Sequence, residues 1–496
     1  MSGRSLLTET EMSISIKKKN EVFMTINAEP AIHMELSDYF TFDVPNAKFM
    51  PLYRNKMWDG KIRLYSPGTG ELYCGLAEHL REWASIKNYD LSFEDNKFYG
   101  HVDDKDPLVS LEGVKYFMNK ICVKHKPRDY QYKAVYEALK NHRKLLLSPT
   151  ASGKSLMIYS LVRYYVAQQK RILIIVPTTS LVEQMYSDFA DYGWDVDEHC
   201  HKVYGGKDKN TDKEVVISTW QSIYKFPKRY FDDFECVIGE EAHQFKSKSL
   251  TGIMTKLHQA KYRFGFTGTL DGSATHKWVL EGLFGPCAQV TKTDRLIKEG
   301  HLAEFRIKIL LLQHEPQTFF TYQDEIDYLV EHKKRNNLIK NLVRDLNGNT
   351  LVLFNYVDRH GLPLYESINK SIGETRKVFF VYGGVDTEER EKIRSITERE
   401  KDAVIIASYG TFSTGINIRN LHNVVFASPS KSRVRNLQSI GRVLRKGEGK
   451  DLATLYDIAD DISEKPNKNY TLKHLEDRIN IYQEENFNYE VIKINV

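Results

Sequence analysis

Short apolar runs recur along two stretches of the chain, each followed by loop residues and then by a segment with helical spacing. Runs of this length fit strands that are buried on both faces, as in a parallel sheet. The segments between them are long enough for crossover helices; after Ser155, for example, Met157, Leu161 and Tyr165 recur at helical spacing. We therefore predict strands over 144–147, 171–176, 215–218, 236–239 and 263–267, and a second series over 350–355, 377–382, 403–407 and 423–427.

Two such series predict an α/β protein with two parallel-sheet domains in tandem. The first 115 residues differ, because a Gly-, Pro- and Asn-rich centre with hairpin-like punctuation indicates a small α+β domain. Near the end, Leu472, Leu475, Ile479 and Tyr482 mark one face of a helix, and an apolar segment follows that adds a strand or packs on the second α/β domain. The expected domains are 1–115, 116–295, 296–470 and a C-terminal helix and strand over 471–496.

Composition narrows the class of protein without naming a partner. The 496 residues are 41% hydrophobic and 28% charged, an ordinary globular balance, and the length fits about three domains. No 18-residue apolar stretch and no secretory signal is evident, and the five cysteines are scattered without a CxxC pair. We expect a cytoplasmic protein without a membrane partner; the net charge of +5 does not identify a ligand.

The segment 148–155, Ser-Pro-Thr-Ala-Ser-Gly-Lys-Ser, nearly matches the phosphate-binding loop GxxxxGK[ST], with Ser148 in place of the first glycine. Backbone N–H groups of such a loop surround the phosphates of ATP, the lysine neutralises them, and the final hydroxyl completes an Mg²⁺ shell. A chance GKS at a helix start is the alternative, which the position between a buried strand and a helix disfavours. The loop residues expected to bind nucleotide are Thr150, Ser152, Gly153, Lys154 and Ser155.

A second apolar run ends in two carboxylates, Glu240 and Glu241, followed by His243. Glu240 stands where a metal-binding Asp is usual, and one extra methylene favours holding Mg²⁺ through water. Glu241 is placed to position the attacking water as general base, and His243 to couple this site to its neighbours. The alternative is an acidic helix cap.

Residues 431–450 contain seven Lys or Arg and one Glu, and include Gln438, Arg442 and Arg445 in a Q-x-x-G-R-x-x-R pattern. On a helix the two arginines are three positions apart and share a face, so both are able to reach a γ-phosphate. A solvated basic helix or a phosphate-backbone patch is the alternative, and it suits Arg433 and Arg435 better.

Residues 48–63 form a second basic segment, with five Lys or Arg and one Asp. Aromatic residues interleaved with cations are able to stack on unpaired bases while holding phosphate, which suits recognition of a DNA branch. The alternative is a Trp58 buried in a hairpin that turns at 59–60. The two are compatible if the cations point outward, and the DNA-contacting candidates are Arg54, Lys56, Trp58, Lys61 and Arg63.

These segments in this order resemble the motifs of superfamily 2 helicases across nearly all of residues 127–446. The further segments that carry the resemblance are 128–131 (RDYQ), 177–181 (PTTSL), 218–221 (STWQ), 267–269 (TGT), 353–355 (LFN), 408–417 (SYGTFSTGIN) and 438–445 (QSIGRVLR). Over the whole chain the sequence is similar to the UvsW-type recombination helicases of phages, through SPTASGKS, ASYGTFSTGI, QSIGRVLRK and YRNKMWDGKIRL.

The resemblance implies two RecA-like motor domains and an ATP- and Mg²⁺-dependent DNA helicase. Such enzymes remodel branched DNA in recombination, repair and replication, by fork regression, Holliday junction branch migration and unwinding of duplexes or R-loops. Their partners would be single-stranded, duplex and branched DNA and RNA–DNA hybrids, and the protein would be monomeric or weakly self-associating. If phage-encoded, it would act in the host cytoplasm.

The resemblance also assigns residues. It implies adenine recognition by Arg128, Tyr130 and Gln131, nucleotide contacts at Gly415 and Asn417, and DNA-backbone contacts at Pro177, Thr178, Thr219, Ser408 and Thr411. Thr219 is alternatively a plain strand end. Two competing functions remain: an RNA helicase of the DEAH/DExH kind, and a nucleic-acid-binding motor relic without ATP turnover, which the Glu240 substitution keeps open.

Overall fold

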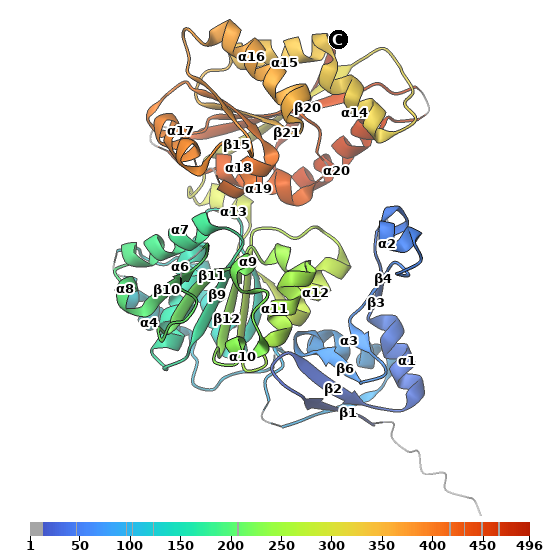
Figure 1. Cartoon of the computed structure of the whole chain (residues 1–496), viewed down its shortest axis with the longest axis vertical. Coiled ribbons are helices and arrows are strands. Elements are labelled where there is room, and N and C mark those ends of the chain that lie inside the picture. The colour runs from blue at the N-terminus through green and yellow to red at the C-terminus, as the bar shows by residue number, and fades with distance from the viewer. Residues whose placement is uncertain are drawn as a thin grey trace, which may run out of the picture. The chain divides into compact units, whose positions relative to one another are not determined.

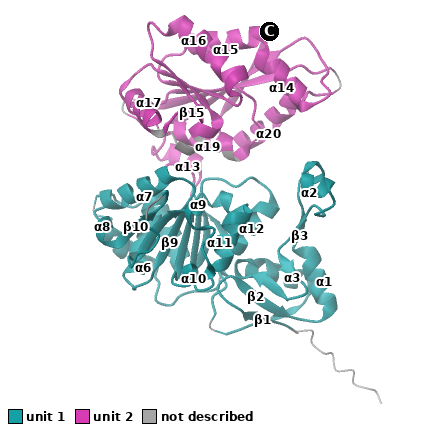
Figure 2. Cartoon of the chain, viewed as in Figure 1, with its two compact units in different colours: residues 1–148, 153–290 teal, residues 149–152, 291–496 magenta. Residues whose placement is uncertain are grey.

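The structure, a computed structural model, describes residues 13–45, 47–95, 97–101, 103–122, 124–205, 208–415, 418–430, 432–447, 450–464 and 467–496. Its described parts group into two compact units, one of residues 1–148 and 153–290 and one of residues 149–152 and 291–496 (Figure 2). No helix among the described residues is long and apolar enough to cross a membrane.

A small domain with a mixed sheet begins the first unit, as the sequence predicted (Figure 1). The sheet order is β5-β6-β2-β1-β7. Its strands are β1 (Ser13–Lys18), β2 (Phe23–Asn27), β5 (Tyr65–Ser66), β6 (Glu71–Tyr73) and β7 (Asp90–Phe93), and its longer helices are α1 (Pro30–Tyr39) and α3 (Ala77–Lys87). A two-stranded ribbon, β3 (Thr41–Asp43) with β4 (Lys61–Arg63), carries the short helix α2 (Pro51–Arg54) away from this sheet (Figure 1).

The rest of the first unit is a seven-stranded parallel sheet in the order β10-β11-β9-β12-β13-β8-β14. Alternate residues of β9 enter different apolar clusters, Ile172 and Ile174 in one and Leu173 and Ile175 in the other, so both faces of the sheet are buried. The strands are β8 (Arg143–Leu147), β9 (Ile172–Val176), β10 (Cys200–Val203), β11 (Val215–Thr219), β12 (Cys236–Glu240), β13 (Tyr262–Thr267) and β14 (Cys287–Gln289). The helices are α4 (Leu111–Ile121), α5 (Asp129–Asn141), α6 (Lys154–Val166), α7 (Thr179–Asp191), α8 (Val196–His199), α9 (Trp220–Ile223), α10 (Lys228–Phe231), α11 (Lys248–Lys256) and α12 (Ala274–Phe284).

The second unit repeats this architecture with a parallel sheet in the order β17-β18-β16-β19-β20-β15-β21. The strands are β15 (Glu304–Gln313), β16 (Thr350–Phe354), β17 (Val378–Val381), β18 (Val404–Ser408), β19 (Asn423–Phe426), β20 (Leu452–Asp461) and β21 (Tyr489–Asn495). The helices are α13 (Thr293–Lys298), α14 (Tyr322–Glu331), α15 (Lys333–Asp345), α16 (Leu362–Ile372), α17 (Thr387–Arg399), α18 (Tyr409–Gly415), α19 (Arg433–Val443) and α20 (Tyr470–Glu484). Two parallel-sheet domains in tandem are therefore confirmed.

Within the first unit, the small domain packs tightly on α12 of the adjoining parallel-sheet domain. A Cβ added at Gly75 would lie 1.9 Å from the carbonyl oxygen of Glu281, so only glycine permits this approach. The His79 Nε2 and Glu281 Oε2 atoms are 2.7 Å apart. The Trp278 ring lies 4.0 Å from that of His79 and 5.0 Å from that of Phe42, centroid to centroid.

Candidate functional site

The predicted phosphate loop joins the carboxyl end of β8 to the first residue of α6, Lys154. Gly153 has φ +79°, and a Cβ there would lie 2.3 Å from the Nε2 atom of Gln131. Glycine is therefore required both for the backbone conformation and for the approach of that side chain. The Lys154 ammonium donates to the carbonyl oxygen of Ser148 at 3.4 Å, and the Ser152 hydroxyl donates to that of Pro149 at 2.6 Å.

The residues expected to recognise adenine lie beside this loop, at the start of α5. Arg128 Nη1 donates to the Tyr130 hydroxyl at 2.7 Å, and the Arg128 backbone N–H donates to Gln131 Oε1 at 2.8 Å. Gln131 Nε2 in turn donates to the Gly153 carbonyl oxygen at 3.5 Å. The fold thus brings the upstream R-x-Y-Q residues and the phosphate loop together.

The Ser155 hydroxyl has a partner that sequence reasoning missed. It lies 2.9 Å from the hydroxyl of Tyr192, which follows α7. The Tyr192 ring packs against Tyr159, with centroids 5.1 Å apart, and burial raises the Tyr192 pKa to about 12, so the phenol stays protonated at neutral pH. Only the tertiary fold brings this hydroxyl to Ser155, since no motif includes it.

The two predicted carboxylates stand at the carboxyl end of β12, where Glu240 ends the strand and Glu241 adopts a left-handed backbone with φ +51°. Burial, and then the neighbouring Glu241 carboxylate, raise the pKa of Glu240 to about 7, although the Lys154 ammonium acts against this. His243 Nδ1 lies 3.0 Å from the Thr267 hydroxyl and 3.3 Å from Glu241 Oε2. His243 therefore joins the end of β12 to the end of β13, and its coupling role stays a prediction.

The candidate DNA contacts of the first unit gather at one edge of its sheet. Pro177 and Thr178 follow β9, and Thr219 ends β11, the strand paired with β9. The Thr178 side chain caps α7 by accepting from the Leu181 N–H at 3.4 Å. Thr219 is only 4% exposed and its hydroxyl lies 2.8 Å from that of Ser222, so its side chain is used at the strand end, and its contact with DNA stays a prediction.

In the second unit, Ser408 ends β18 and Thr411 lies in α18, with their hydroxyls 2.8 Å apart. Gly415 is the last residue of α18. Asn417, the other expected nucleotide contact of this segment, lies outside the described residues.

Helix α19 carries Gln438 and Arg442, and the Arg442 guanidinium lies 5.7 Å from the centre of the Phe412 ring in α18. The helix ends at Val443, however, so the expectation that Arg445 shares its helical face is wrong. Arg445 instead forms an antiparallel bridge with Leu302. Arg433 is used within the unit, in ion pairs with Glu484 and Glu485.

Lys450, which no motif singled out, holds the end of α19. Its ammonium donates to the carbonyl oxygens of Val443, Arg445 at 2.9 Å and Arg419 at 3.1 Å, while the side chain is 1% exposed. A helix leaves its last carbonyls without intrahelical partners, and Val443 is the last residue of α19. The three N–H bonds of the ammonium therefore serve this carbonyl and two carbonyls outside the helix. Lys450 thus fixes the segment that carries Arg442 and Arg445 against the chain that follows α18.

In the small domain, the predicted basic residues lie on and beside the residues between β3 and β4, named here the β3–β4 arm (residues 44–45 and 47–60). Trp58 is half-buried and its indole N–H donates to the Lys61 carbonyl oxygen at 2.8 Å. Residues 59–60 lead into β4 and do not turn a hairpin, so that alternative is wrong in detail. All five cations of the region are exposed: Lys48, Arg54, Lys56, Lys61 and Arg63, the last paired with Asp59 at 2.5 Å. Sequence reasoning missed the arm's exposed apolar side chains, Phe49, Leu52 and Met57, which are 54–74% exposed.

Three family models match separate parts of the chain. Residues 13–94 match the N-terminal domain of DNA helicase UvsW, residues 124–272 match the res subunit of type III restriction enzymes, and residues 333–447 match the helicase conserved C-terminal domain.

Individual relatives agree with these matches. The ATP-dependent DNA helicase uvsW of Enterobacteria phage T4 is 35% identical over 98% of this chain and 100% of its own length. The crystal structure of T4 UvsW superposes with a TM-score of 0.52 at 32% identity, covering 98% of this chain and all of that one. The DNA 3'-5' translocase XPB2 of Sulfurisphaera tokodaii is 26% identical over 56% of this chain and 59% of its own.

Proposed function

Because the chain belongs to the UvsW family of ATP-dependent DNA helicases, we propose that it uses ATP hydrolysis to remodel branched DNA. Its reactions would be fork regression, Holliday junction branch migration and unwinding of duplexes or R-loops, in recombination, repair and replication. Its substrates would be single-stranded, duplex and branched DNA and RNA–DNA hybrids, handled by a monomer or a weakly self-associating protein. A host-cell cytoplasmic setting fits this role.

In the ATPase step, Lys154 neutralises the phosphates and Glu241 positions the attacking water. Arg442 and Arg445, with Gln438, stabilise the charge that develops on the transferred phosphoryl group. The hydrogen bond that joins Gln131 to Gly153 supports this assignment, because it ties the residues expected to recognise the base to the phosphate loop.

The donor set near Lys154 fits Mg²⁺, which prefers hard oxygen ligands and commonly uses one or two carboxylates together with substrate phosphates. Ser155 offers a hydroxyl, and Glu240 a carboxylate whose pKa rises in its buried, acidic surroundings. A bound Mg²⁺ would neutralise phosphate charge during hydrolysis. Ser155 and Glu240 would hold the ion, and the Tyr192 hydroxyl would orient Ser155.

DNA would be held through its backbone at the carboxyl edges of the two sheets. In the first unit Thr178 offers a hydroxyl, and Pro177 and Thr219 offer backbone groups. In the second unit Ser408 and Thr411 offer hydroxyls. Such groups contact phosphates without reading sequence. Sequence-independent contacts suit an enzyme that moves along DNA.

The observation that carries branch recognition is the β3–β4 arm, which projects from the small domain (Figure 1). Its cations Arg54 and Lys56 are exposed, and so is Lys61, the first residue of β4 at the end of the arm. The apolar side chains of Phe49 and Met57 are 67% and 74% exposed. Exposed apolar side chains next to cations suit the unstacked bases and close phosphates of a branch point.

The test is a triple substitution of the arm, Arg54→Ala, Lys56→Ala and Lys61→Ala. Its matched control removes three exposed lysines of α4, α5 and the segment between them, Lys120→Ala, Lys124→Ala and Lys133→Ala. We expect four-way-junction unwinding to fall about tenfold in the arm variant, because lost phosphate contacts weaken binding, while ATPase activity on single-stranded DNA persists. Equal junction unwinding by the arm variant, the control and the wild type would refute branch recognition by the arm.

A further inference from the structure

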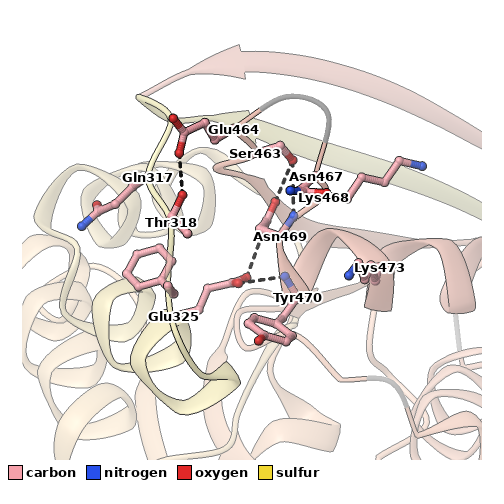
Figure 3. Close-up of a pocket in the computed structure, with 11 residues that line it drawn as sticks. Gln317, Thr318, Glu325, Ser463, Glu464, Asn467, Lys468, Asn469, Tyr470 and Lys473 are labelled. Atoms are coloured by element: carbon pink, nitrogen blue, oxygen red, sulfur yellow. Dashed lines mark hydrogen bonds between the residues drawn. The ribbon is translucent and has the colours of Figure 1, made fainter.

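Two loops in the second unit enclose a cavity that the helicase motifs do not include. One loop follows β15 and the other follows β20, its parallel neighbour, so both leave the carboxyl edge of the sheet. The cavity has a volume of about 350 Å³, which falls in the range of small-molecule sites (Figure 3). We name it the β15–β20 pocket; its lining residues used below are Gln317, Thr318, Glu325, Asn467, Tyr470 and Lys473.

The walls of this pocket are fixed by Glu325, which is 1% exposed. Its carboxylate accepts from the Asn469 amide at 2.7 Å and from the backbone N–H groups of Tyr470 at 2.8 Å and Thr471 at 2.7 Å. Glu325 therefore caps the first turn of α20 and ties α14 to it. The Thr318 hydroxyl joins the two loops by donating to Glu464 at 2.5 Å (Figure 3). The pocket is thus formed without a ligand, and the carboxylates of Glu325 and Glu464 are both used in hydrogen bonds that hold its walls.

Aromatic side chains gather beside the pocket and face solvent. Phe320 is 96% exposed, and Tyr322 and Tyr470 are each 37% exposed. The Tyr470 hydroxyl donates to the Phe320 carbonyl oxygen at 3.3 Å, and the Tyr322 and Tyr470 rings are 6.3 Å apart. The ammonium of Lys473 lies 5.8 Å from the centre of the Tyr470 ring. The Phe320 backbone is thus held against Tyr470 while its ring is exposed to solvent, so the ring is free to stack on a ligand at the pocket.

The chemistry of this surface matches a nucleotide. Aromatic faces stack on unpaired bases of any sequence, the amides of Gln317 and Asn467 offer donors and acceptors to a base edge, and the exposed Lys473 suits a phosphate. A peptide ligand would instead need an apolar groove or a free strand edge, whereas this lining is mostly polar.

The position of the pocket extends the proposed DNA path. The sheet order runs β18-β16-β19-β20-β15, and all these strands are parallel. Ser408, a proposed backbone contact, ends β18, so β20 lies three strand spacings, roughly 14 Å, to the side of it. The pairing register puts Ser408 level with Ile458, so the end of β20 at Asp461 lies three residues, roughly 10 Å, further along the strand direction. A strand of DNA held at Ser408 and Thr411 therefore reaches the pocket within a few nucleotides.

We propose that the β15–β20 pocket binds an unpaired nucleotide of the DNA strand, with Phe320 and Tyr470 stacking on the base and Lys473 contacting phosphate. The inference rests on the proposed function in one respect, that DNA passes along this edge of the sheet. It adds a single-strand binding site outside the helicase motifs.

The experiment measures fluorescence anisotropy of labelled oligo(dT) and of a blunt DNA duplex with the full chain, across a salt series. Phe320→Ala removes only an exposed ring, and Lys473→Ala only an exposed charge. The matched control is Tyr116→Ala, which removes a 73% exposed aromatic from α4 in the other unit. Millimolar dTMP serves as a competitor, to distinguish a DNA strand from a free nucleotide as the ligand.

For oligo(dT), we expect Phe320→Ala to raise Kd about fivefold or more, because each base–aromatic stack contributes substantially to binding. Lys473→Ala should lower the salt dependence by about one phosphate contact. Affinity for the blunt duplex should be unchanged by Phe320→Ala, since paired bases stack on each other, and Tyr116→Ala should match the wild type throughout.

If the wild type binds oligo(dT) and both pocket variants match it, the pocket assignment is overturned while the proposed function stands. An equal loss on the blunt duplex, or displacement of oligo(dT) by dTMP, would also overturn it. If the wild type binds no DNA, both the pocket assignment and the proposed function fall.

Discussion

A single buried ammonium, that of Lys450, joins the chain after α18 to the end of α19. It donates to three backbone carbonyls, and burial lowers its pKa from 10.5 to about 7. The carboxylate of Glu398 acts in the opposite direction but does not restore the ordinary value. The buried Lys450 side chain thus stabilises the end of α19, the helix that carries Arg442.

This arrangement predicts a pH-dependent contribution to stability. Between the folded pKa and 10.5 the unfolded chain binds more protons at Lys450 than the folded chain, so the free energy of unfolding rises with pH in this window. The slope from this group is at most about 1.4 kcal/mol for each pH unit. Lys450→Met removes this titrating group. We therefore expect the melting temperature of the wild type, minus that of the variant, to increase by roughly 2–4 °C between about pH 7 and about pH 9. The measurement is thermal unfolding of both proteins at each pH. A temperature difference that stays constant or shrinks would contradict the assignment.

At this scale the sequence predicted the residues whose chemistry is local. Glu240 and Glu241 stand at the end of a buried strand, and Lys154 follows one after a short loop, so their placement at the carboxyl edge of a sheet follows from the pattern alone. Tyr192 and Lys450 could not be predicted, because each acts through a contact with a residue distant along the chain, Ser155 at 2.9 Å and Arg419 at 3.1 Å. Their side chains belong to no spacing pattern.

At the scale of elements, the predicted strands all occur within two residues of their expected bounds, because continuous apolar runs buried on both faces are a strong signal. The strands β10, β14, β15 and β20 were missed. In β15 the charged residues Glu304, Arg306 and Lys308 alternate with buried ones. The first half of this strand therefore lacks a continuous apolar run and resembles a polar segment between domains. The early end of α19 was also missed, because the bridge of Arg445 to Leu302 is a long-range contact.

The contact between the small domain and α12 is an element that predicts a measurable coupling. Trp278 packs among Tyr39, Phe42 and His79, so Trp278→Ala should weaken docking of the small domain by on the order of 2–4 kcal/mol. Amide hydrogen exchange in β6 and α3 should accelerate in this variant, while exchange in β9 and β12 stays slow.

The control for this prediction is Ile86→Ala, which removes a 74% exposed side chain from α3. If Trp278→Ala and Ile86→Ala leave the same exchange pattern as the wild type, the small domain does not depend on this contact for its docking.

At the scale of the whole molecule, the near-neutral net charge of +5 conceals two concentrated basic segments, 48–63 and 431–450. The first forms the β3–β4 arm and its flanks. The second holds α19, where Arg433 is used in ion pairs with Glu484 and Glu485 and Lys450 in capping a helix end. Charge clustering in the sequence therefore predicted which two segments are basic. The fold determines which of their cations remain exposed to a nucleic acid.

The central claim is that ATP hydrolysis drives this chain to remodel branched DNA, and conversion of a mobile four-way DNA junction tests it most directly. The measurement compares the wild type with Lys154→Ala, with and without ATP, and measures ATPase activity on DNA and on RNA in parallel. The wild type should resolve the junction only with ATP, and Lys154→Ala should be slower by on the order of 100-fold while still binding the junction. An intact junction with the wild type, equal conversion by Lys154→Ala, or stimulation of ATPase activity by RNA alone would contradict the account.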